Sequence, residues 1–388
     1  MQIASRMSPV SPSATLKLTS KAKEMKSKGL PVISFGAGEP DFDTPQAVKD
    51  EAIRALRSGF TKYTPTSGIW ELREAVCRKF EADQGLVYDP HQVVISCGAK
   101  HSLYNLMQVL CDPADEVLIS APYWVSYPEM VALAGGKPVF IQTSQAEGFR
   151  LTPERLNSAL TAKSKILILN SPANPTGAIL EEKDLKAIGE IVLKNNLIVI
   201  SDEIYEYYLY KGARHVSIAS LGEALKKRTF VVNGVSKSYS MTGLRIGYLA
   251  GDEAVVKKIG ILQDHSTSNP ASISQRMALA ALGLPNSYRE EVRKIFEKRS
   301  QLMVKLLSRV KGFEPFTPQG AFYVFCNIEG TGFGSEALCE RLLEEIYVAV
   351  IPGKSFGSDR HVRFSFAAGE NDIEAGVNKI IQWTKTRT

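Results

Sequence analysis

Short runs of apolar residues, rich in valine and isoleucine, recur along the first two thirds of the chain and predict buried strands. The runs are 93–96, 116–120, 138–143, 165–171, 197–202, 228–232 and 247–250. Segments between several of them, such as 99–110 and 182–196, have apolar residues spaced by three and four positions, which predicts amphipathic helices. Strands and helices that alternate in this way predict a mainly parallel sheet covered by helices.

The pattern changes near residue 287. A long helical segment over about 287–310 precedes a strand at 320–327, a helix near 336–345, a strand at 361–366 and a final helix. With 388 residues, the chain is long enough for one large domain and a smaller one. We therefore expect an α/β protein in three parts. They are an N-terminal arm and helix (1–29) that pack with the small domain, a large domain (30–286) and a small α/β domain (287–388).

The composition is that of an ordinary soluble globular protein, with 44% hydrophobic and 23% charged residues. Lysine and arginine number 47 against 41 aspartate and glutamate, which gives a net charge of +6, and the charges are interspersed. The densest basic stretch, 17–28, has no interleaved aromatic residues, which favours an exposed helix over a nucleic-acid site. No stretch approaches the roughly 20 apolar residues that a membrane span needs. We expect neither nucleic acid nor a membrane as a partner.

The cysteines bear on the compartment and on metal binding. There are five, an odd number, and they form no C-x-x-C pair, so neither a disulfide framework nor a zinc site is expected. The N-terminal residues do not show the basic segment and apolar run of a secretion signal. We therefore expect a cytoplasmic protein without a metal site.

Polar residues and glycines follow several of the predicted strands. Gly98 to Lys100 follow one strand, Asn174 lies after another, and Asp202 and Tyr205 close a third. Ligands of parallel sheets gather at the carboxyl ends of the strands, where loops meet helix N-termini. These residues are therefore expected to lie at one binding edge.

The segment 236–247 places Lys237 after a strand and Arg245 eight residues later, among small residues. A lysine here can attack an aldehyde if burial or a nearby cation lowers its pKa. The planar guanidinium donors of Arg245 can hold a phosphate. Taken alone, however, the segment favours an ordinary surface loop.

The other segments also have two interpretations each. Asp202 is either a helix N-cap or a partly buried carboxylate that pairs with the protonated ring nitrogen of a cofactor. The segment 170–177, with its prolines and glycine, is by itself an ordinary turn. Gly98 to Lys100 form either a plain strand-to-helix turn or a phosphate site at the free N–H groups of a helix start.

Taken together, the order and spacing of these segments match one family. The chain resembles the class I aminotransferases of the type I pyridoxal-phosphate fold, and most closely their bacterial aspartate aminotransferase branch. The resemblance covers nearly the whole chain. It rests on PSAT at 12–15, GAGEPDF at 36–42, KY at 62–63, PYWVSYP at 122–128, NSPANPTG at 170–177, SDEIY at 201–205, the lysine segment at 236–247 and GAFY at 320–323.

The resemblance implies pyridoxal 5′-phosphate as the cofactor, bound by the large domain. Lys237 would carry it as a Schiff base and would then move a proton during the reaction. Asp202 would pair with the pyridine nitrogen, Asn174 and Tyr205 would hold the ring oxygen, and Trp124 would stack on the ring. The other residues implied to bind the cofactor are Gly98, Ala99, Lys100, Ser236, Arg245 and Tyr63, the last from the second subunit of a homodimer with shared active sites.

The resemblance also implies how the substrate binds. Arg363 would bind its α-carboxylate as a bidentate pair, assisted by the backbone of Gly38, and Trp124 and Asn174 would lie beside it. The alternation of apolar residues around Arg363 places it on the opposite strand face, although an exposed structural arginine is the alternative. Lys100 resembles the residue that meets a distal carboxylate, which favours aspartate and glutamate.

Two positions depart from the family pattern. Gly234 stands three residues before Lys237, where many relatives have a phosphate-binding serine, so one phosphate contact is expected to be missing. Ser11 stands where branch members that also accept prephenate have a lysine, so prephenate is not expected as a substrate.

We therefore predict an aminotransferase that converts aspartate and 2-oxoglutarate to oxaloacetate and glutamate by a ping-pong cycle. The alternatives within the fold are an aminotransferase for aromatic or other amino acids and a pyridoxal-phosphate-dependent β-lyase. A non-catalytic regulator that binds the cofactor is a remote alternative. Such regulators carry a DNA-binding module ahead of this domain, whereas only a short arm precedes Gly36 here.

Overall fold

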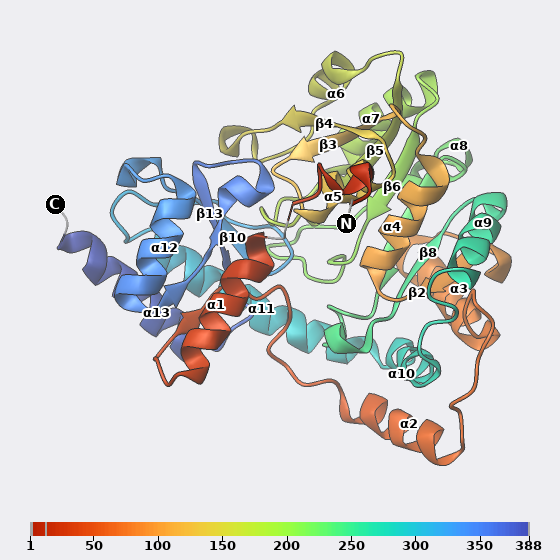
Figure 1. The fold of residues 1–388 in the computed structure, drawn as a ribbon, viewed down its shortest axis with the longest axis horizontal. Helices are drawn as coiled ribbons and strands as arrows, with labels where there is room; N and C mark the ends of the chain where they lie inside the picture. Colours follow the sequence, from red (N-terminus) through yellow and green to blue (C-terminus); the bar gives the residue numbers. More distant parts are fainter. Residues whose placement is uncertain (1–2, 12–13, 387–388) are drawn as a thin grey trace.

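A seven-stranded sheet forms the centre of the larger part of the molecule (Figure 1). The computed structural model describes residues 3–11 and 14–386. The strand order is β2-β8-β7-β6-β5-β3-β4; β8 runs antiparallel to both neighbours and the other pairs are parallel. The strands are β2 (Val93–Ser96), β3 (Glu116–Ala121), β4 (Lys137–Gln142), β5 (Ser164–Asn170), β6 (Ile198–Asp202), β7 (Thr229–Gly234) and β8 (Gly247–Ala250). The predicted mainly parallel sheet is thus confirmed, with one reversed strand that the apolar pattern did not reveal.

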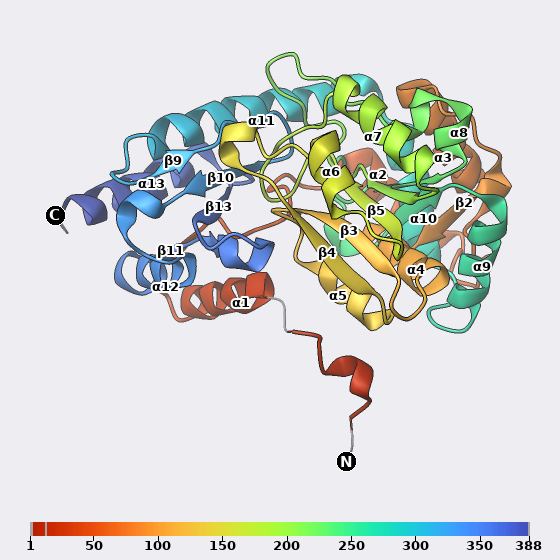
Figure 2. The ribbon, with the colours of Figure 1, turned by 90° about the horizontal axis from the view of Figure 1, so that it is seen from above.

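Helices cover both faces of this sheet (Figure 2). Successive side chains of a strand point to opposite faces, so along β5 Ile166 and Ile168 belong to one apolar cluster, and Leu167 and Leu169 to another. The first cluster includes residues of α4 (Ala99–Leu110), α5 (Ser126–Leu133) and α9 (Glu253–Asp264). The second includes residues of α6 (Pro153–Ala159), α7 (Glu182–Lys194) and α8 (Glu223–Lys226). The helices predicted over 99–110 and 182–196 are therefore confirmed.

A third group of helices packs at the β2 and β8 end of the sheet. They are α2 (Gln46–Arg57), α3 (Trp70–Gln84) and α10 (Ser272–Leu282). Short 3-10 helices lie in loops at η2 (Pro90–Gln92), η3 (Gln145–Glu147), η4 (Ile218–Leu221), η5 (Thr242–Leu244), η6 (Glu329–Thr331) and η7 (Gly353–Phe356).

The C-terminal part contains a second sheet, with strand order β12-β13-β10-β9. Its strands are β9 (Glu314–Pro315), β10 (Tyr323–Asn327), β12 (Ile351–Pro352) and β13 (His361–Ser365). The helices of this part are α11 (Asn286–Leu307), α12 (Ser335–Ile346) and α13 (Glu370–Lys385). The strand predicted over 320–327 begins only at Tyr323, because Ala321 has a left-handed φ of 57° and Gly320 forms an isolated bridge with Leu209.

The N-terminal residues contact both parts of the molecule. The helix α1 (Ala14–Ser27) buries Ala22 in a cluster with Leu343 and Ala349, and β1 (Ile33–Ser34) pairs with β11 (Val348–Ala349). Ahead of α1, the chain with η1 (Ser5–Met7) runs past α5, and the backbone N–H of Ser11 donates to Glu129 at 3.0 Å (Figure 2). Pro12 and Ser13 of the predicted PSAT motif lie outside the described residues. The proposed division at residues 29/30 and 286/287 stays a prediction.

Two properties concern the whole described chain. In residues 3–11 and 14–386, no helix is both long and apolar enough to cross a membrane. The five cysteines all lie in this part and are free thiols, of which Cys111, Cys326 and Cys339 are buried.

Candidate active site

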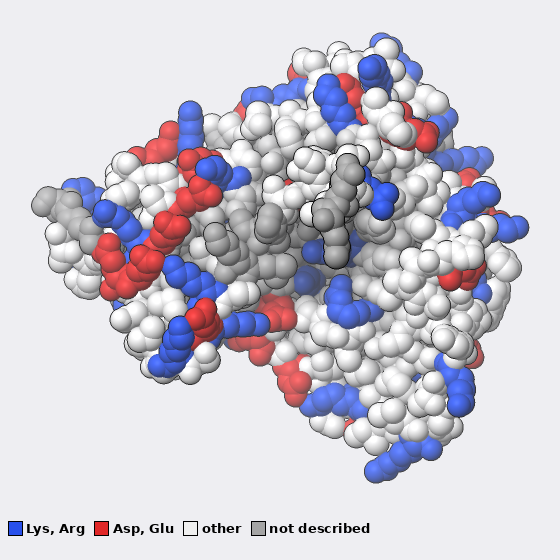
Figure 3. Space-filling model, in the orientation of Figure 1, with Lys and Arg blue, Asp and Glu red and all other residues white. Residues whose placement is uncertain are grey.

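A cavity of about 650 Å³ lies at the carboxyl ends of the central strands, between the large sheet, α1 and the C-terminal part. Figure 3 shows the hollow near the centre of one face, with basic side chains inside it. The predicted site residues that line the cavity are Gly38, Ala99, Lys100, Trp124, Asn174, Asp202, Tyr205, Ser236, Lys237, Arg245 and Arg363. Residues predicted from scattered segments are thus brought together around one space.

Lys237 lies in the loop after β7, and its Nζ donates to the carbonyl oxygen of Gly38 at 2.6 Å. Burial lowers the pKa of Lys237 to about 8; Arg245 and Arg363 act in the same direction, and Glu39 opposes them. An amine with this pKa is neutral in a useful fraction of molecules near neutral pH, which makes it a nucleophile. The predicted surface loop is therefore the wrong interpretation of this segment.

The backbone around Lys237 is also held in place. Tyr208 donates its hydroxyl to the carbonyl oxygen of Lys237 at 2.7 Å, and Thr44 donates to the carbonyl oxygen of Ser240 at 2.7 Å. Both contacts come from segments far away in the sequence. The lysine thus projects from a fixed loop rather than from a loose turn.

Asp202 ends β6 and is 4% exposed. Its Oδ2 accepts a hydrogen bond from the hydroxyl of Tyr127 at 2.7 Å, and its Oδ1 accepts from the backbone N–H of Ile204 at 3.3 Å. Burial raises the pKa of Asp202 to about 6, against the opposing effect of these two hydrogen bonds. The alternative as a helix N-cap is wrong, because a turn follows Asp202 and the next helix, η4, begins only at Ile218.

A corner suited to phosphate is formed where Arg245 meets the start of α4. Arg245 donates to the carbonyl oxygen of Thr242 at 2.8 Å and to that of Cys97 at 3.3 Å. Gly98 precedes α4 with a φ of 91°, and a Cβ at this position would collide with the guanidinium of Arg245. The N-terminus of α4 carries a partial positive charge, and with Arg245 it makes a dianion favourable here. The glycine is needed for this close approach.

The departure at Gly234 has a packing reason. Gly234 pairs with Gly247 across β7 and β8, and a Cβ on Gly234 would lie 3.1 Å from the Cα of Gly247 and from the carbonyl oxygen of Ile246. A side chain at this position would crowd the two strands. The serine expected from the family pattern would fit here only with a small shift of β8.

The residues expected around the cofactor ring form one connected group. Asn174 donates its backbone N–H to the side-chain oxygen of Asn170 at 2.9 Å, which orients the loop. The hydroxyl of Tyr205 lies 2.9 Å from that of Tyr323, and burial raises the pKa of Tyr205 well above its usual value. Trp124 lies edge-on to the Tyr127 ring that contacts Asp202.

Arg363 lies on β13 and is 4% exposed, so an exposed structural arginine is excluded. It donates to the side-chain oxygen of Asn174 at 2.9 Å and to the carbonyl oxygen of Gly36 at 3.0 Å, and it lies over the ring of Tyr323. Among the described residues, its Nε has no hydrogen-bond partner, and no carboxylate pairs with it. A buried cation without an anion indicates that an anionic ligand completes the site.

Lys100, in the first turn of α4, offers a second cation. Its Nζ lies 4.9 Å from the centre of the Trp124 ring. Burial lowers the pKa of Lys100, and the charge of Arg245 adds to this effect. The cavity therefore has positive charge at Arg363 and at Lys100, as a dicarboxylate requires.

Several residues of the site were not assigned a role from the sequence. Tyr127 and Tyr323 lie in segments that carried the family resemblance, so their position in those motifs could have suggested a role. Gly36 also lies in such a segment, whereas Lys23 of α1 gives no such indication, because only the tertiary structure brings it to the cavity. Tyr63 is 90% exposed and is not among the residues that line the cavity in the single chain.

The comparisons with known proteins agree with this geometry. The aminotransferase class I and II family matches residues 31–380, so the chain belongs to this family. Aspartate aminotransferase of Bacillus subtilis (strain 168) is 47% identical over 385 residues, 98% of each chain. That of Geobacillus stearothermophilus is 48% identical over 392 residues, 100% of each chain. The solved structure of the Thermus thermophilus aspartate aminotransferase with maleate has a TM-score of 0.95 at 39% identity and covers 98% of this chain and 99% of that one.

These findings confirm the predicted family and its fold, and the family implies pyridoxal 5′-phosphate as cofactor. The residues present fit that group. A buried amine with a lowered pKa suits its aldehyde, a buried carboxylate suits its ring nitrogen, and the corner at Arg245 and Gly98 suits its phosphate. All of these groups lie at or beside one cavity of sufficient size.

Proposed function

We propose that this protein is a pyridoxal-phosphate-dependent aminotransferase that passes the amino group of aspartate to 2-oxoglutarate, with oxaloacetate and glutamate as products. The observation that carries the proposal is the joint placement of Lys237, Asp202, Arg363 and Lys100 around one cavity. The relatives with 47% and 48% identity are named aspartate aminotransferases, which supports the same substrate. Maleate, present in the similar solved structure, is itself a dicarboxylate.

The residues around the cofactor have separate tasks. When bound, pyridoxal phosphate supplies an electron-withdrawing ring that stabilises negative charge at the substrate's Cα. Asp202 would keep a proton on the ring nitrogen, because its buried carboxylate has, among the described residues, the hydroxyl of Tyr127 as its only side-chain hydrogen-bond donor. Arg245 and the start of α4 would hold the phosphate, and Asn174 and Tyr205 would hold the ring oxygen. Trp124 would lie against the ring.

Lys237 has two roles in this proposal. Its neutral amine would hold the cofactor covalently through the aldehyde carbon, with loss of water. When not bound to the cofactor, the same amine would serve as the base that takes the proton from the substrate's Cα and as the acid that returns it. The pKa of about 8 suits both roles, because the group gains and loses a proton near neutral pH.

Arg363 and Lys100 orient the substrate. Arg363 forms a bidentate pair with the α-carboxylate, and its contacts to Asn174 and Gly36 fix the guanidinium plane. Lys100 meets the distal carboxylate of aspartate or glutamate. The two cations together select substrates with carboxylates at both ends.

The test is a single half-reaction. The absorption spectrum of the cofactor-loaded protein is recorded before and after L-aspartate is added alone, with alanine, tyrosine and leucine as parallel additions. We expect aspartate to convert the spectrum from the aldehyde form to the amine form, and 2-oxoglutarate to reverse the change. Faster conversion by tyrosine or leucine would overturn the aspartate assignment, and release of ammonia would indicate β-elimination.

We also propose that the protein acts as a homodimer with shared active sites, in which Tyr63 contributes to the phosphate site of the other subunit. The 90% exposure of Tyr63 in the single chain supports this proposal, because it leaves the side chain accessible to a second subunit. A cytoplasmic location stays a prediction.

A further inference from the structure

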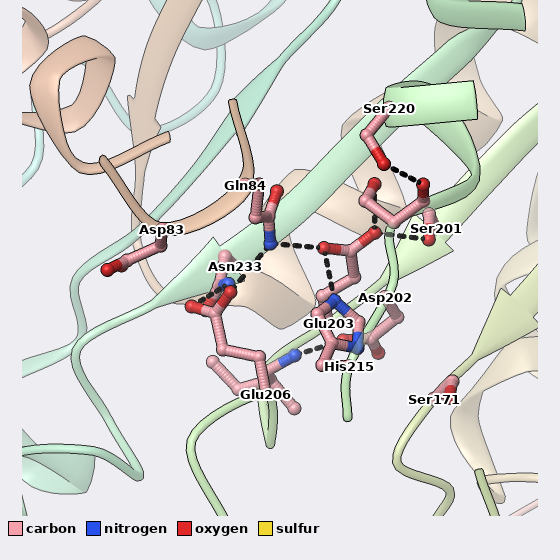
Figure 4. A network of polar contacts seen from close by, with 12 residues as sticks. Asp83, Gln84, Ser171, Ser201, Asp202, Glu203, Glu206, His215, Ser220 and Asn233 are labelled. Atoms are coloured by element: carbon pink, nitrogen blue, oxygen red, sulfur yellow. Dashed lines mark hydrogen bonds and ion pairs between the residues drawn. The ribbon is translucent and has the colours of Figure 1, made fainter. Parts of the chain in front are cut away.

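A buried polar network lies behind Asp202, away from the cavity (Figure 4). At its centre is the carboxylate of Glu203, which is fully buried. One oxygen of Glu203 accepts hydrogen bonds from the hydroxyls of Ser201 and Ser217, each at 2.7 Å. The other accepts from the amide of Gln84 at 2.7 Å and interacts with the His215 ring at 2.9 Å. Four partners thus fix this one side chain.

A second buried carboxylate continues the network. Glu206 accepts hydrogen bonds from Asn233 and from Gln84, each at 2.7 Å, and Lys79 lies 2.5 Å from its oxygen. The amide of Gln84 therefore bridges the two carboxylates. Because Asn233 belongs to β7, Glu206 links the segment after β6 to the neighbouring strand.

The positions of these residues connect the network to the proposed catalytic site. Glu203 directly follows Asp202, which faces the cavity, and Asn233 lies four residues before Lys237. Neither Glu203 nor Glu206 is among the residues that line the cavity. The network therefore holds, from behind, the two strand ends that present Asp202 and Lys237.

The charges within the network are balanced. Burial alone would raise the pKa of Glu203, but the charge and hydrogen bond of His215, together with the hydrogen bonds of Ser217 and Ser201, outweigh it and leave that pKa lowered. Burial likewise opposes protonation of His215, yet Glu203 leaves the pKa of His215 raised. Lys79 lies beside Glu206 and His215 beside Glu203, so each buried carboxylate has a basic side chain as its partner. Buried charges persist only when they are paired in this way.

The same atoms do not form a convincing metal site. Ligand atoms of Glu203, Glu206 and His215 lie within 4.8 Å of one another, which is close enough to hold an ion. However, Lys79 and Gln84 already occupy the carboxylate oxygens that a cation would need. The arrangement is that of a closed hydrogen-bond network.

We propose that Glu203 and Glu206 are positioning residues for the cofactor: they anchor the ends of β6 and β7 so that Asp202 and Lys237 meet its ring nitrogen and its aldehyde together. This inference rests on the proposed function. A site preorganised by supporting hydrogen bonds loses affinity when that support is removed, even though the groups that touch the ligand are unchanged.

The test compares cofactor binding by the apo proteins of the wild type and of Glu203→Gln. The glutamine amide has one oxygen that can accept hydrogen bonds and one NH₂ group that cannot, so it cannot accept from all four partners of Glu203. An NH₂ group on the side of Gln84 and His215 would face their donor groups. We expect the dissociation constant for pyridoxal phosphate, measured by absorbance titration, to rise about tenfold, as one lost hydrogen bond to a charged group predicts. The pH titration of the bound cofactor's absorbance should shift as well.

Glu116→Gln is the matched control. Glu116 is 4% exposed, as is Glu206, and accepts hydrogen bonds from Lys137 at 3.0 Å and from Ser164 at 3.4 Å, but it lies at the opposite end of the strands, at the start of β3. This substitution should lower the melting temperature and change cofactor affinity by less than about twofold. An equal loss of affinity in both variants would mean a general loss of stability and would overturn the inference.

Two more variants distinguish an effect on the position of Asp202 and Lys237 from an effect of charge on cofactor affinity. His215→Ala removes a basic partner of Glu203, and Glu203→Gln removes the negative charge itself, so a purely electrostatic effect would not weaken binding in both variants. The proposal predicts weaker binding in both. Gln84→Ala keeps every charge and removes only the bridge; it should weaken binding about threefold, and it serves if Glu203→Gln does not fold.

The outcomes distinguish this inference from the proposed function. If the wild type binds pyridoxal phosphate and neither Glu203→Gln nor Gln84→Ala binds it more weakly than Glu116→Gln, the positioning role is wrong and the proposed function stands. Tighter binding by Glu203→Gln would also overturn it. If the wild type itself binds no pyridoxal phosphate, the proposed function fails.

Discussion

Burial displaces the pKa values of three ionisable side chains that face the cavity. It lowers those of Lys237 and Lys100 and raises that of Asp202. Each shift moves the group away from its charged form, as expected for groups whose charge is meant to be completed by a ligand. These three side chains therefore suit a ligand that carries charge and binds covalently.

The pKa of Lys237, about 8, leads to a prediction for the apo protein. Only the neutral amine attacks an aldehyde, and the amine is protonated below its pKa. The rate constant for capture of pyridoxal phosphate should therefore rise with pH and level off above about 8. Stopped-flow absorbance measures it, with an N-blocked lysine as reference. If the rate constant for the protein keeps rising up to a pH of about 10, as that of the N-blocked lysine does, the lowered pKa of Lys237 is contradicted.

A second residue-scale prediction concerns Lys100→Leu. The substitution removes the cation but keeps an apolar contact with Trp124, so only substrates with a distal carboxylate should suffer. We expect kcat/KM for aspartate and glutamate to fall about 10- to 100-fold, the effect of one charged hydrogen bond, with a much smaller change for alanine. Steady-state kinetics with each amino acid measures this. Equal losses for alanine and aspartate would show that Lys100 does not select dicarboxylates.

At the scale of elements, the strand ends decide where the chemistry lies. β6 ends at Asp202, β7 leads to Lys237, and α4 begins beside Arg245. These strands are hydrogen-bonded neighbours in the sheet, with β8 on the far side of β7. Close packing of β7 and β8 at Gly234 is therefore part of what fixes the loop that carries Lys237.

That packing predicts the outcome of Gly234→Ser. The variant introduces the serine expected from the family pattern, but its Cβ crowds Gly247 and Ile246. We expect the free energy of unfolding to fall by about 1–3 kcal/mol, without tighter binding of pyridoxal phosphate. Gly243→Ser, where a Cβ meets nothing within 4 Å, is the matched control. Urea unfolding measures both; a stable Gly234→Ser protein with tighter cofactor binding would refute the packing explanation.

At the scale of the whole molecule, the single chain forms the cavity from the large sheet, α1 and β13, and leaves Tyr63 outside it. The proposed homodimer would bring in Tyr63 from the second subunit. An active site that needs both subunits makes activity depend on assembly, so subunits with different defects can complement each other.

Complementation tests this arrangement. Lys237→Ala and Tyr63→Ala subunits are mixed by joint refolding. If Tyr63 acts across the interface, a hybrid dimer has one site with both substitutions and one with neither, and the mixture should reach about a quarter of wild-type activity. Each variant refolded alone is the control. No gain over Tyr63→Ala alone would mean that Tyr63 acts in its own subunit or has no role.

Much of this protein was determined by its sequence. The alternation of apolar runs predicted the strands and helices, because burial of one face leaves a periodic pattern in the chain itself. Ordered motifs identified the family, and with it Lys237, Asp202 and Arg363 as candidate site residues. These inferences succeed because they depend on local pattern and on the order of segments.

Only the tertiary structure decided which groups meet. Tyr127 reaches Asp202 across 75 residues, Arg363 reaches the Gly36 carbonyl across 327, and the reversed direction of β8 follows from strand pairing. The apolar pattern of a sequence indicates that a side chain is buried, but it does not indicate which residue that side chain contacts. The paired charges around Glu203 likewise arise only when α3, β6 and β7 come together, since contacts between distant segments leave no periodic trace in the sequence.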